Sequence, residues 1–346
     1  MFSRSQSPCL FSRKVRDFSF SGRASSDPSG SRLPFPVPRL APRIRLFLVM
    51  LLGMAAFGHT QKSQSKIDTG NQANISRTVY TDDIGRKVEL PSHPSRIISL
   101  APSITETLYL LGAEGQLTGV TDQSDWPEAA RLKPRIGDLL NPNFEIILNA
   151  KPDLIIASTA GNDRAAVMKL AELGLPVFVT APRSLEKIFE SVETIGRITG
   201  REAEGQQLVS RMKAHLEAIR QRLVGLTPMR AFFVTWFDPL LAPGKNTFEN
   251  DVLRLANAVS ITAEVEEFYP RYSLEQVLAQ DPDVILTVVH PGNPLPDLSK
   301  LAGWGNLRAV RQGRVYSLNE VLQHPSPRFI EGVEQLAAIL HPERFQ

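Results

Sequence analysis

Cysteine is almost absent from this chain. Among its 346 residues there is one cysteine, Cys9, close to the amino terminus. If a leader that contains Cys9 is removed on export, the mature protein has no thiol, which excludes disulfides, thiolate catalysis and zinc–thiolate sites. A lipid anchor on a cysteine directly after an apolar leader segment is excluded for the same reason.

Long apolar runs are also missing. Residues 46–57 form an apolar run of twelve residues, which is shorter than the roughly 20 that a membrane-spanning helix needs. Arg43 and Arg45 precede this run, and small residues up to Gly58 follow it. Such a layout is typical of a secretory signal peptide, here with an extended n-region, so we expect residues 1–58 to be removed. The alternative is an uncleaved leader that tethers the protein to the membrane.

A net positive charge is confined to this leader. The whole chain has a formal net charge of +3, but residues 1–58 hold nine Lys and Arg residues and two Asp residues. Subtracting these from the totals of 39 and 36 leaves 30 basic and 34 acidic residues, a net charge of −4. A body of this charge lacks the basic footprint of a nucleic-acid-binding protein, so no nucleic-acid partner is expected.

Sequence signatures of common enzymes are missing as well. The chain contains no G-x-S-x-G, GxxxxGK[ST], H-E-x-x-H or strand-linked G-x-G-x-x-G motif. No two histidines have H-x-x-x-H spacing, so a zinc site is poorly supported. We therefore expect no catalytic residues, no metal site and no resident cofactor.

The chain does carry alternating strand and helix patterns. A polar tether is expected over residues 59–76, and a hairpin with its turn at residues 82–85 follows it. Helical segments separate the next predicted strands, which lie at residues 96–100, 118–121, 154–157 and 177–180. Strands that alternate with helices indicate a parallel α/β sheet.

A helix that ends at Gly112 is predicted after the first of these strands. Ser103 and Glu106 have the S-x-x-E spacing of a capping box, in which each side chain accepts a hydrogen bond from a free backbone N–H. We therefore expect Glu106 to stabilise the start of this helix.

The second half of the chain repeats the α/β pattern. Residues 184–223 predict one long charged helix without proline, weakened at Gly196 and Gly200. Beyond it, a strand is predicted at residues 230–236 and a closing helix from Ser326, with proline at its first position. The remaining elements are a helix near residues 247–256 and strands at 284–289 and 314–318.

An internal repeat relates the two halves. Residues 143–157 read NFEIILNAKPDLIIA, and residues 273–287 read SLEQVLAQDPDVILT. Each copy has a helix-capping residue, an apolar residue and a glutamate, followed by a short helix, Pro-Asp and a buried strand. The repeat predicts two equivalent lobes, although helix–Pro-Asp–strand is also a common α/β connector. The predicted domains are an N-terminal lobe over 77–183, a connecting helix over 184–226 and a C-terminal lobe over 227–346.

Several of these stretches resemble a known family. They are RIISLAPSITETLYLLG (96–112), SDWP (124–127), AKPDLIIA (150–157), PGKNTFENDVL (243–253), SLEQVL (273–278) and HPSPRFIEG (324–332). They resemble the helical-backbone periplasmic solute-binding proteins of ABC importers, most nearly the cobalamin-binding branch.

The resemblance implies an architecture and a mode of action. Such proteins have two Rossmann-like α/β lobes with central parallel sheets, joined by one long rigid helix, and clamp a ligand between the lobes. We therefore expect a periplasmic monomer that binds cobalamin or a related corrinoid and delivers it to the permease dimer of an ABC importer.

Candidate ligand contacts follow from the strand ends. Ligands of open α/β sheets bind outside the carboxyl ends of the strands, and a corrin needs aromatic walls and a few hydrogen-bonding groups. The strand ends give the candidates Pro102, Trp126, Trp236, Glu320 and His324. The resemblance adds Tyr269, which lies where the family has an aromatic ligand contact, and Arg328 is a further candidate, with an interaction near the final helix as its alternative. Loop packing is the alternative for Trp126 and core packing for Trp236.

Three residues refine this prediction. His324 is expected to form hydrogen bonds or a cap, with axial ligation of cobalt or iron as the alternative. Trp304 is expected to pack the second lobe. Leu139 stands where the resemblance leads us to expect a tryptophan, so one aromatic wall is missing.

Glu145 and Glu275 occupy equivalent places in the repeat. A carboxylate in the first turn of a helix is stabilised by the helix dipole, by roughly 0.3–1 kcal/mol, which is one explanation for each. The resemblance implies a second role, because matching glutamates in the family meet arginines on the two transporter subunits.

Two rival functions remain open. The first is a ferric siderophore or haem on the same scaffold, for which Arg271, Tyr272 and Arg328 are suitable residues. The second is an α/β enzyme or a metal chaperone.

Overall fold

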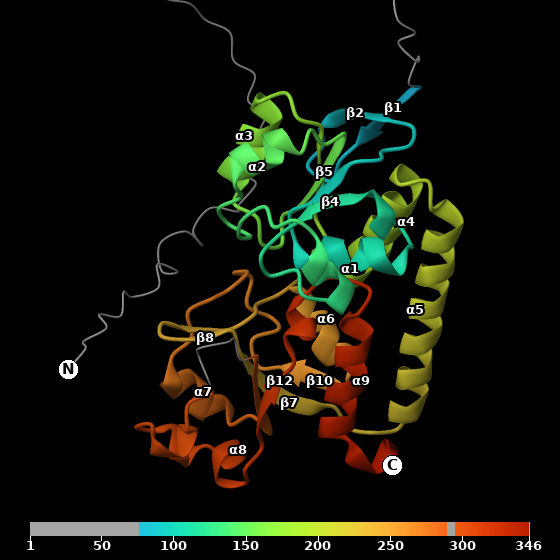
Figure 1. The fold of residues 1–346 in the computed structure, drawn as a ribbon. Helices are drawn as coiled ribbons and strands as arrows, with labels where there is room; N and C mark the ends of the chain where they lie inside the picture. Colours follow the sequence, from blue (N-terminus) through green and yellow to red (C-terminus); the bar gives the residue numbers. More distant parts are fainter. Residues whose placement is uncertain (1–75, 289–294, 346) are drawn as a thin grey trace, which may run out of the picture. The chain divides into compact units, whose positions relative to one another are not determined.

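The computed structural model describes residues 76–288 and 295–345 (Figure 1). The predicted leader over 1–58, with Cys9, lies outside the described residues, as does the predicted tether up to residue 75. No helix in the described part of the chain is long and apolar enough to cross a membrane.

The first lobe is built on a four-stranded parallel sheet. Its strands are β3 (Ile97–Ser99), β4 (Leu117–Val120), β5 (Leu154–Ser158) and β6 (Val177–Thr180), in the order β4-β3-β5-β6. Successive residues of β5 face opposite sides: Leu154 and Ile156 belong to one apolar cluster, Ile155 and Ala157 to another. Both faces of the sheet are therefore buried, which explains its almost unbroken apolar strands.

Helices cover both faces of this sheet. The helices α1 (Pro102–Leu110) and α4 (Leu185–Ile198) share the cluster of Leu154, whereas α2 (Phe144–Asn149) and α3 (Arg164–Glu172) share the cluster of Ile155. At one end, β1 (Arg77–Thr81) and β2 (Lys87–Pro91) form the predicted antiparallel hairpin.

The second lobe has the same strand order. Its parallel strands are β7 (Met229–Val234), β10 (Ala258–Ser260), β11 (Val284–Val288) and β12 (Val315–Leu318), in the order β10-β7-β11-β12. Its helices are α6 (Phe248–Leu255), α7 (Leu274–Gln280), α8 (Arg308–Arg311) and α9 (Phe329–Leu340). The prediction of two parallel α/β lobes is confirmed.

The repeat extends to matching backbone details. Lys151 and Asp281, which are 130 positions apart, both have positive φ angles, 44° and 37°. In the first lobe Asp153 accepts a hydrogen bond from the N–H of Arg96 at 2.9 Å, and in the second Asp283 accepts one from Arg230 at 2.9 Å. Each Pro-Asp therefore connects the start of its own strand to the start of the neighbouring strand.

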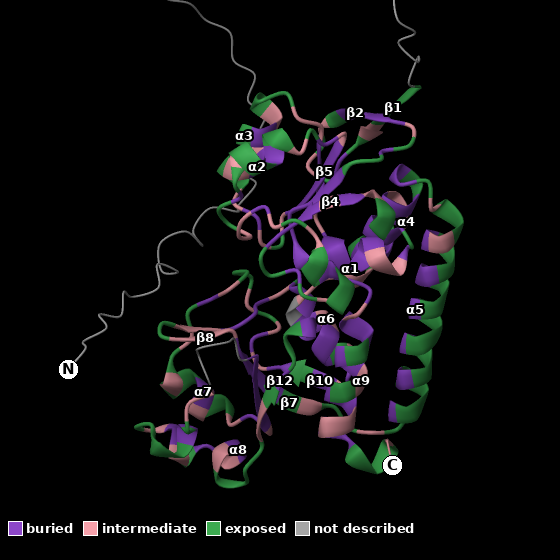
Figure 2. Ribbon diagram, in the orientation of Figure 1, coloured by how far each residue is buried: buried purple, intermediate pink, exposed green. Residues whose placement is uncertain are grey.

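The expected single helix over residues 184–223 is wrong. The chain forms two helices, α4 and α5 (Glu202–Leu223), separated at Gly200, whose φ angle is +73°. The turn brings the two helices close together. This packing needs a glycine at position 196, because a Cβ on Gly196 would lie 2.7 Å from the carbonyl oxygen of Arg201. The long helix is α5 alone, and Figure 2 shows its buried and exposed residues on opposite sides.

Two boundaries in the second lobe differ from the prediction. The strand expected to reach Trp236 ends at Val234, and Trp236 belongs to a separate hairpin of β8 (Trp236–Phe237) and β9 (Leu240–Leu241). The closing helix begins at Phe329 rather than at residue 327, with Arg328 as its N-cap. Short 3-10 helices complete the fold, among them η5 (Glu320–Gln323).

Candidate ligand-binding site

A cluster of buried hydroxyls holds the loop that carries Trp126. The hydroxyl of Ser124 lies 3.0 Å from that of Thr105 in α1 and 2.9 Å from that of Thr121, directly after β4. The guanidinium of Arg135 donates to the carbonyl oxygens of Thr121 and Ser124, at 2.6 and 3.1 Å. The loop is thereby fixed to α1 and to the carboxyl end of β4.

Glu106 connects the two lobes. Its side chain is 4% exposed, and it points from α1 of the first lobe to the loop before α9 of the second. One carboxylate oxygen lies 3.3 Å from Nδ1 of His324 and 3.6 Å from Nη1 of Arg328, and the other accepts a hydrogen bond from the hydroxyl of Ser326. A buried carboxylate with three polar partners is well compensated for the loss of water.

The predicted capping box is therefore wrong. Helix α1 begins at Pro102, its N-cap is Ala101, and no side chain caps it. Proline is favoured at the first helical position because its missing N–H needs no partner there. Ser103 therefore lies inside the helix and does not cap it. In the sequence, Pro102 was the signal for this earlier start, and thus for a role of Glu106 other than capping.

Arg328 covers a face of Trp126. Its Cζ atom lies 4.1 Å from the centre of the Trp126 ring, which is the geometry of a cation–π contact. Arg328 also lies 3.3 Å from a carboxylate oxygen of Glu331, and its side chain is 17% exposed. Two carboxylates, those of Glu106 and Glu331, therefore compensate the charge of this arginine.

The predicted aromatic contacts of the second lobe lie on neighbouring segments. Trp236 donates its indole N–H to the carbonyl oxygen of Asp238 at 2.8 Å. The backbone N–H of Tyr272 donates to the carbonyl oxygen of Leu240 in β9 at 3.0 Å. Residues 269–272 therefore lie beside β9, the strand that pairs with β8 and its Trp236.

Tyr269 is held by a buried carboxyl group. Its hydroxyl donates to Glu249 at 2.9 Å, and Glu249 is 7% exposed in the first turn of α6. Burial raises the pKa of Glu249, although the hydrogen bonds that it accepts oppose this. Burial and the nearby Glu249 raise the pKa of the Tyr269 hydroxyl, so this hydroxyl stays a hydrogen-bond donor at neutral pH.

The remaining candidates have different environments. Pro102 is buried as the first residue of α1, and Glu320 is exposed at the start of η5. Of the residues that suited a siderophore, Tyr272 packs against Phe232 with ring centres 5.8 Å apart, whereas Arg271 is exposed. The structure thus brings Trp126, His324 and Arg328 together, places Trp236 and Tyr269 on neighbouring segments, and packs the half-buried Tyr272 against an apolar cluster of the second lobe.

Trp304 and Leu139 both pack against apolar residues. Trp304 is buried in the second lobe, with its ring 5.9 Å from that of Phe237, so the prediction that it packs this lobe is confirmed. Leu139, where a tryptophan was expected, packs at the edge of an apolar cluster.

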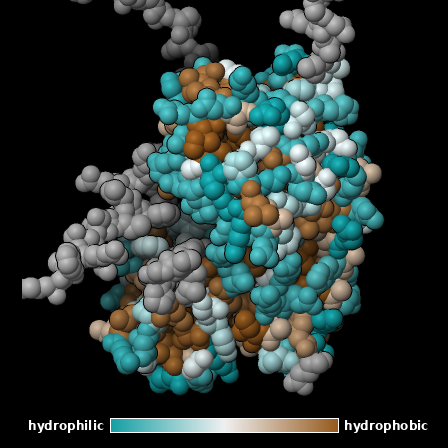
Figure 3. All heavy atoms as spheres, in the orientation of Figure 1, coloured by the Kyte–Doolittle hydropathy of each residue, from teal (hydrophilic) through white to brown (hydrophobic). Residues whose placement is uncertain are grey.

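The two repeated glutamates are exposed in equivalent first turns. Glu145 follows Asn143, which caps α2, and Glu275 follows Ser273, which caps α7. A backbone hydrogen bond and the Ser273 hydroxyl lower the pKa of Glu275, so its carboxylate is charged at neutral pH. Figure 3 shows apolar surface over the part of the first lobe where α2 and α3 lie.

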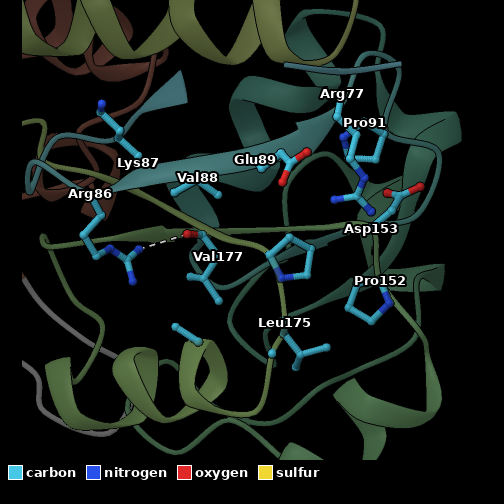
Figure 4. Close-up of a pocket in the computed structure, with 13 residues that line it drawn as sticks. Arg77, Arg86, Lys87, Val88, Glu89, Pro91, Pro152, Asp153, Leu175 and Val177 are labelled. Atoms are coloured by element: carbon cyan, nitrogen blue, oxygen red, sulfur yellow. Dashed lines mark hydrogen bonds between the residues drawn. The ribbon is translucent and has the colours of Figure 1, made fainter. Parts of the chain in front are cut away.

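A separate surface pocket of about 480 Å³ lies in the first lobe, between the β1–β2 hairpin and the starts of β5 and β6 (Figure 4). None of the predicted ligand contacts lines it. Arg86 in its wall pairs with Asp82 at 2.7 Å and donates to the carbonyl oxygen of Val177 at 2.9 Å. These bonds attach the hairpin to the sheet, so Arg86 has a structural role here.

No group of three or more His, Cys, Asp or Glu residues suitable for a metal ion occurs within residues 76–288 and 295–345. Glu106 and His324 approach each other without a third residue of these kinds. The geometry therefore offers hydrogen-bonding and stacking groups for a ligand.

Comparison with known proteins identifies the class of this chain. A family model for periplasmic binding proteins matches residues 97–322. A vitamin B12-binding protein of Vibrio cholerae is 32% identical over 252 residues, which cover 72% of this chain and 90% of that protein. An uncharacterised ABC transporter substrate-binding lipoprotein of Bacillus subtilis is 29% identical over 309 residues, 87% of this chain and 96% of that one.

Solved structures agree with this result. The crystal structure of the periplasmic vitamin B12-binding protein of Vibrio cholerae aligns with a TM-score of 0.63 at 32% identity, covering 73% of this chain and 99% of that one. A periplasmic haem-binding protein from a Roseiflexus species aligns with a TM-score of 0.65 at 24% identity, covering 72% and 99%, and supports the fold alone.

The chain therefore belongs to the periplasmic binding protein family. It is an ABC-type substrate-binding protein, which is a transport component and not an enzyme, and such proteins bind small ligands and interact with a membrane permease.

Proposed function

We propose that this protein binds cobalamin or a related corrinoid between its lobes and delivers it to the permease dimer of an ABC importer. The observation that carries the proposal is the stack of Arg328 on Trp126, with two carboxylates beside the arginine. It presents a flat aromatic and guanidinium surface whose positive charge is already compensated.

Such a surface suits a large ligand with apolar faces and neutral polar groups on its rim. Aromatic side chains supply contact area, and the hydroxyl oxygen of Tyr269 and the ring nitrogen of His324 that does not face Glu106 supply hydrogen bonds. Trp236 adds a second aromatic group from the second lobe. The 32% identity to a vitamin B12-binding protein supports the same ligand class.

A ferric siderophore or haem is the alternative ligand. An anionic ligand gains most from cations whose charge is still available. Arg328 is already paired with carboxylates, whereas Arg271 is exposed and Tyr272 is half-buried, so Arg271 and Tyr272 are the residues that still favour this alternative.

The proposed docking contacts are Glu145 and Glu275. Each is exposed in the first turn of the equivalent helix of its lobe, which suits a partner with one binding place on each of two subunits. In the first lobe, Ile146 and Leu148 beside Glu145 are 42% and 40% exposed. Apolar surface around a charged contact is typical of an interface, because it excludes water from the ion pair.

The proposed location is the periplasm. Its support is the leader pattern over residues 1–58 and the family of the chain. We propose that the mature protein acts there as a monomer.

Titration of the purified mature protein tests the proposed function. The panel contains cyanocobalamin, haem and a ferric hydroxamate, and binding is followed by calorimetry and by the absorption spectrum of each ligand. We expect one corrinoid to bind per protein, with quenching of tryptophan fluorescence. Binding of haem or the hydroxamate without any binding of the corrinoid would transfer the assignment to the alternative.

A further inference from the structure

We propose that Glu106 is a positioning residue that assembles the ligand site across the two lobes. Its carboxylate holds the loop of residues 324–328 in the one arrangement that places the Arg328 guanidinium over the ring of Trp126. The effect on ligand affinity rests on the proposed function, whereas the effect on Trp126 is a property of the ligand-free protein.

On the first lobe, the neighbour of Glu106 is linked to the loop that carries Trp126. This neighbour, Thr105, donates to Ser99 at 2.8 Å and lies 3.0 Å from Ser124, two residues before Trp126. In this turn of α1, the side chain of Thr105 therefore faces the Trp126 loop, and the side chain of Glu106 faces the second lobe. Helix α1 is itself anchored in the core, since Ile104 and Leu108 are at most 2% exposed.

On the second lobe, the partners of Glu106 lie on one constrained loop. Ser326 is fully buried between two prolines, and its hydroxyl oxygen accepts a hydrogen bond from the N–H of Arg328 at 3.2 Å while donating to Glu106. The next residue, Phe329, is also fully buried and packs edge to face on Phe248, with ring centres 5.4 Å apart. The loop therefore transmits the position of Glu106 to the backbone of Arg328.

Arg328 has an alternative if Glu106 loses its charge. Glu331, one turn further along α9, lies 3.3 Å from Nη2 of Arg328, and its side chain is 54% exposed. Without the charge of Glu106, the guanidinium is drawn toward Glu331 and the solvent, away from the indole ring. Glu106 thus decides whether the cation covers Trp126.

This role differs from that of a simple stabilising ion pair. A buried carboxylate is a weak source of stability but fixes one geometry among several. Here the geometry that it fixes is the contact between an aromatic group of one lobe and a cation of the other. Loss of Glu106 should therefore change the ligand site of a protein that is still folded.

The test is Glu106→Gln in the mature protein, with Glu334→Gln as the matched control. Like Glu106, Glu334 joins two elements: it lies on α9 and bridges to α5 through His215 at 3.0 Å and Arg222 at 3.2 Å, but no hydrogen bond or ion pair links it to the loop of residues 324–328. The fluorescence of Trp126, taken as the difference from a Trp126→Phe protein, and its quenching by acrylamide are measured without ligand. We expect a changed spectrum and stronger quenching for Glu106→Gln, and neither for Glu334→Gln.

Ligand binding gives the second measurement. The corrinoid affinity should fall about tenfold in Glu106→Gln, equivalent to about 1.4 kcal/mol, and stay unchanged in Glu334→Gln. Ser326→Ala removes the loop's hydroxyl while leaving Glu106 intact, and should shift the Trp126 signal in the same direction. It serves in place of Glu106→Gln if that protein does not fold.

The outcomes separate this inference from the proposed function. An unchanged Trp126 signal in both variants overturns the positioning role, even if the wild-type protein binds a corrinoid. A changed Trp126 signal in a protein that binds no corrinoid supports the positioning role and overturns the ligand assignment. Non-additive effects in the double variant Glu106→Gln, Ser326→Ala would confirm that the two residues act through one contact.

Discussion

Arg328 and Trp126 lie on different lobes of this protein, yet the guanidinium carbon of Arg328 is 4.1 Å from the centre of the indole ring. The indole belongs to a loop fixed by buried hydroxyls, and the guanidinium to a loop fixed by Glu106. The contact between the two loops therefore joins residues that are far apart in the sequence. This contact and the residues around it lead to testable predictions.

Replacing Trp126 by Ala should weaken corrinoid binding. The variant loses an aromatic wall and the surface on which Arg328 lies, and a lost buried aromatic contact corresponds to roughly 1–3 kcal/mol. Calorimetric titration measures the change. Trp126→Phe keeps a ring and should lose less, so equal losses in the two variants would contradict a role for the ring face.

Reversing the charges of Glu145 and Glu275 together should abolish transporter docking and ligand uptake. Exposed ion pairs contribute only about 0–1 kcal/mol each, but a reversed charge at an interface adds repulsion. Binding to the permease in detergent or nanodiscs, and uptake by cells, measure the effect of Glu145→Arg with Glu275→Arg. Glu172→Arg, an exposed change elsewhere on the first lobe, is the control.

The ligand affinity of this double variant should stay close to that of the wild type. Both glutamates are exposed on α2 and α7, and neither contacts the residues around Glu106 in any hydrogen bond or ion pair of the described chain. A combined loss of docking and ligand binding would make these residues general stabilisers of the fold. If the variant docks fully, stabilisation by the helix dipole would be the remaining explanation for the position of these two glutamates.

Glu249→Gln should change how stability depends on pH. Burial raises the pKa of Glu249 in the folded protein above its ordinary value of 4.5. The folded state then binds this proton more tightly than the unfolded state, so the contribution of this group to stability falls as pH rises through the raised pKa. Glutamine cannot ionise and still accepts the hydrogen bond from Tyr269.

The glutamine variant should therefore gain stability relative to the wild type as pH rises above about 4.5, with little difference below it. Urea unfolding between pH 4 and pH 8 measures the difference. Parallel curves for the two proteins across this range would mean that Glu249 is no less solvated in the folded protein than in the unfolded chain.

Gly196→Ala should destabilise the fold. A Cβ at this position would lie 2.7 Å from the carbonyl oxygen of Arg201 and 3.3 Å from the Cα of Gly205, so α4 and α5 would have to separate. Such overpacking costs about 1–3 kcal/mol, measurable by urea unfolding. Gly115→Ala, where no atom lies within 4 Å, should change stability by less than about 0.5 kcal/mol.

The mature amino terminus should lie near Gly58. The apolar run over residues 46–57 and the small residues after it predict cleavage there. Sequencing the amino terminus of exported protein checks this position. An intact leader in the membrane fraction would instead indicate an uncleaved tether.

Much of the fold could be predicted because its signals are local. The strands at 154–157 and 177–180 are short apolar runs bounded by turn residues, and the structure has β5 and β6 there. The repeat between residues 143–157 and 273–287 predicted two lobes, because the same short pattern of cap, helix, Pro-Asp and strand imposes the same local geometry.

The wrong predictions arose where one local sequence pattern is compatible with more than one structure. The S-x-x-E pattern of Ser103 and Glu106 suits a capping box, but Pro102 starts the helix earlier and leaves Glu106 free to cross to the other lobe. The charged stretch over residues 184–223 suits one helix as well as two. Close packing between Gly196 and Gly205 favours two helices, and such packing is invisible in periodicity.

For this protein, the sequence by itself determined the α/β class, the two-lobe repeat, the single cysteine and the residue types available to a ligand. Those properties depend on composition and on spacings of a few residues. Only the tertiary structure decided that Glu106, Ser326 and Arg328 share one contact and that the arginine covers Trp126. Glu106 and Ser326 are 220 positions apart, and no helical or strand period relates such residues, because their contact depends on how the two lobes pack together.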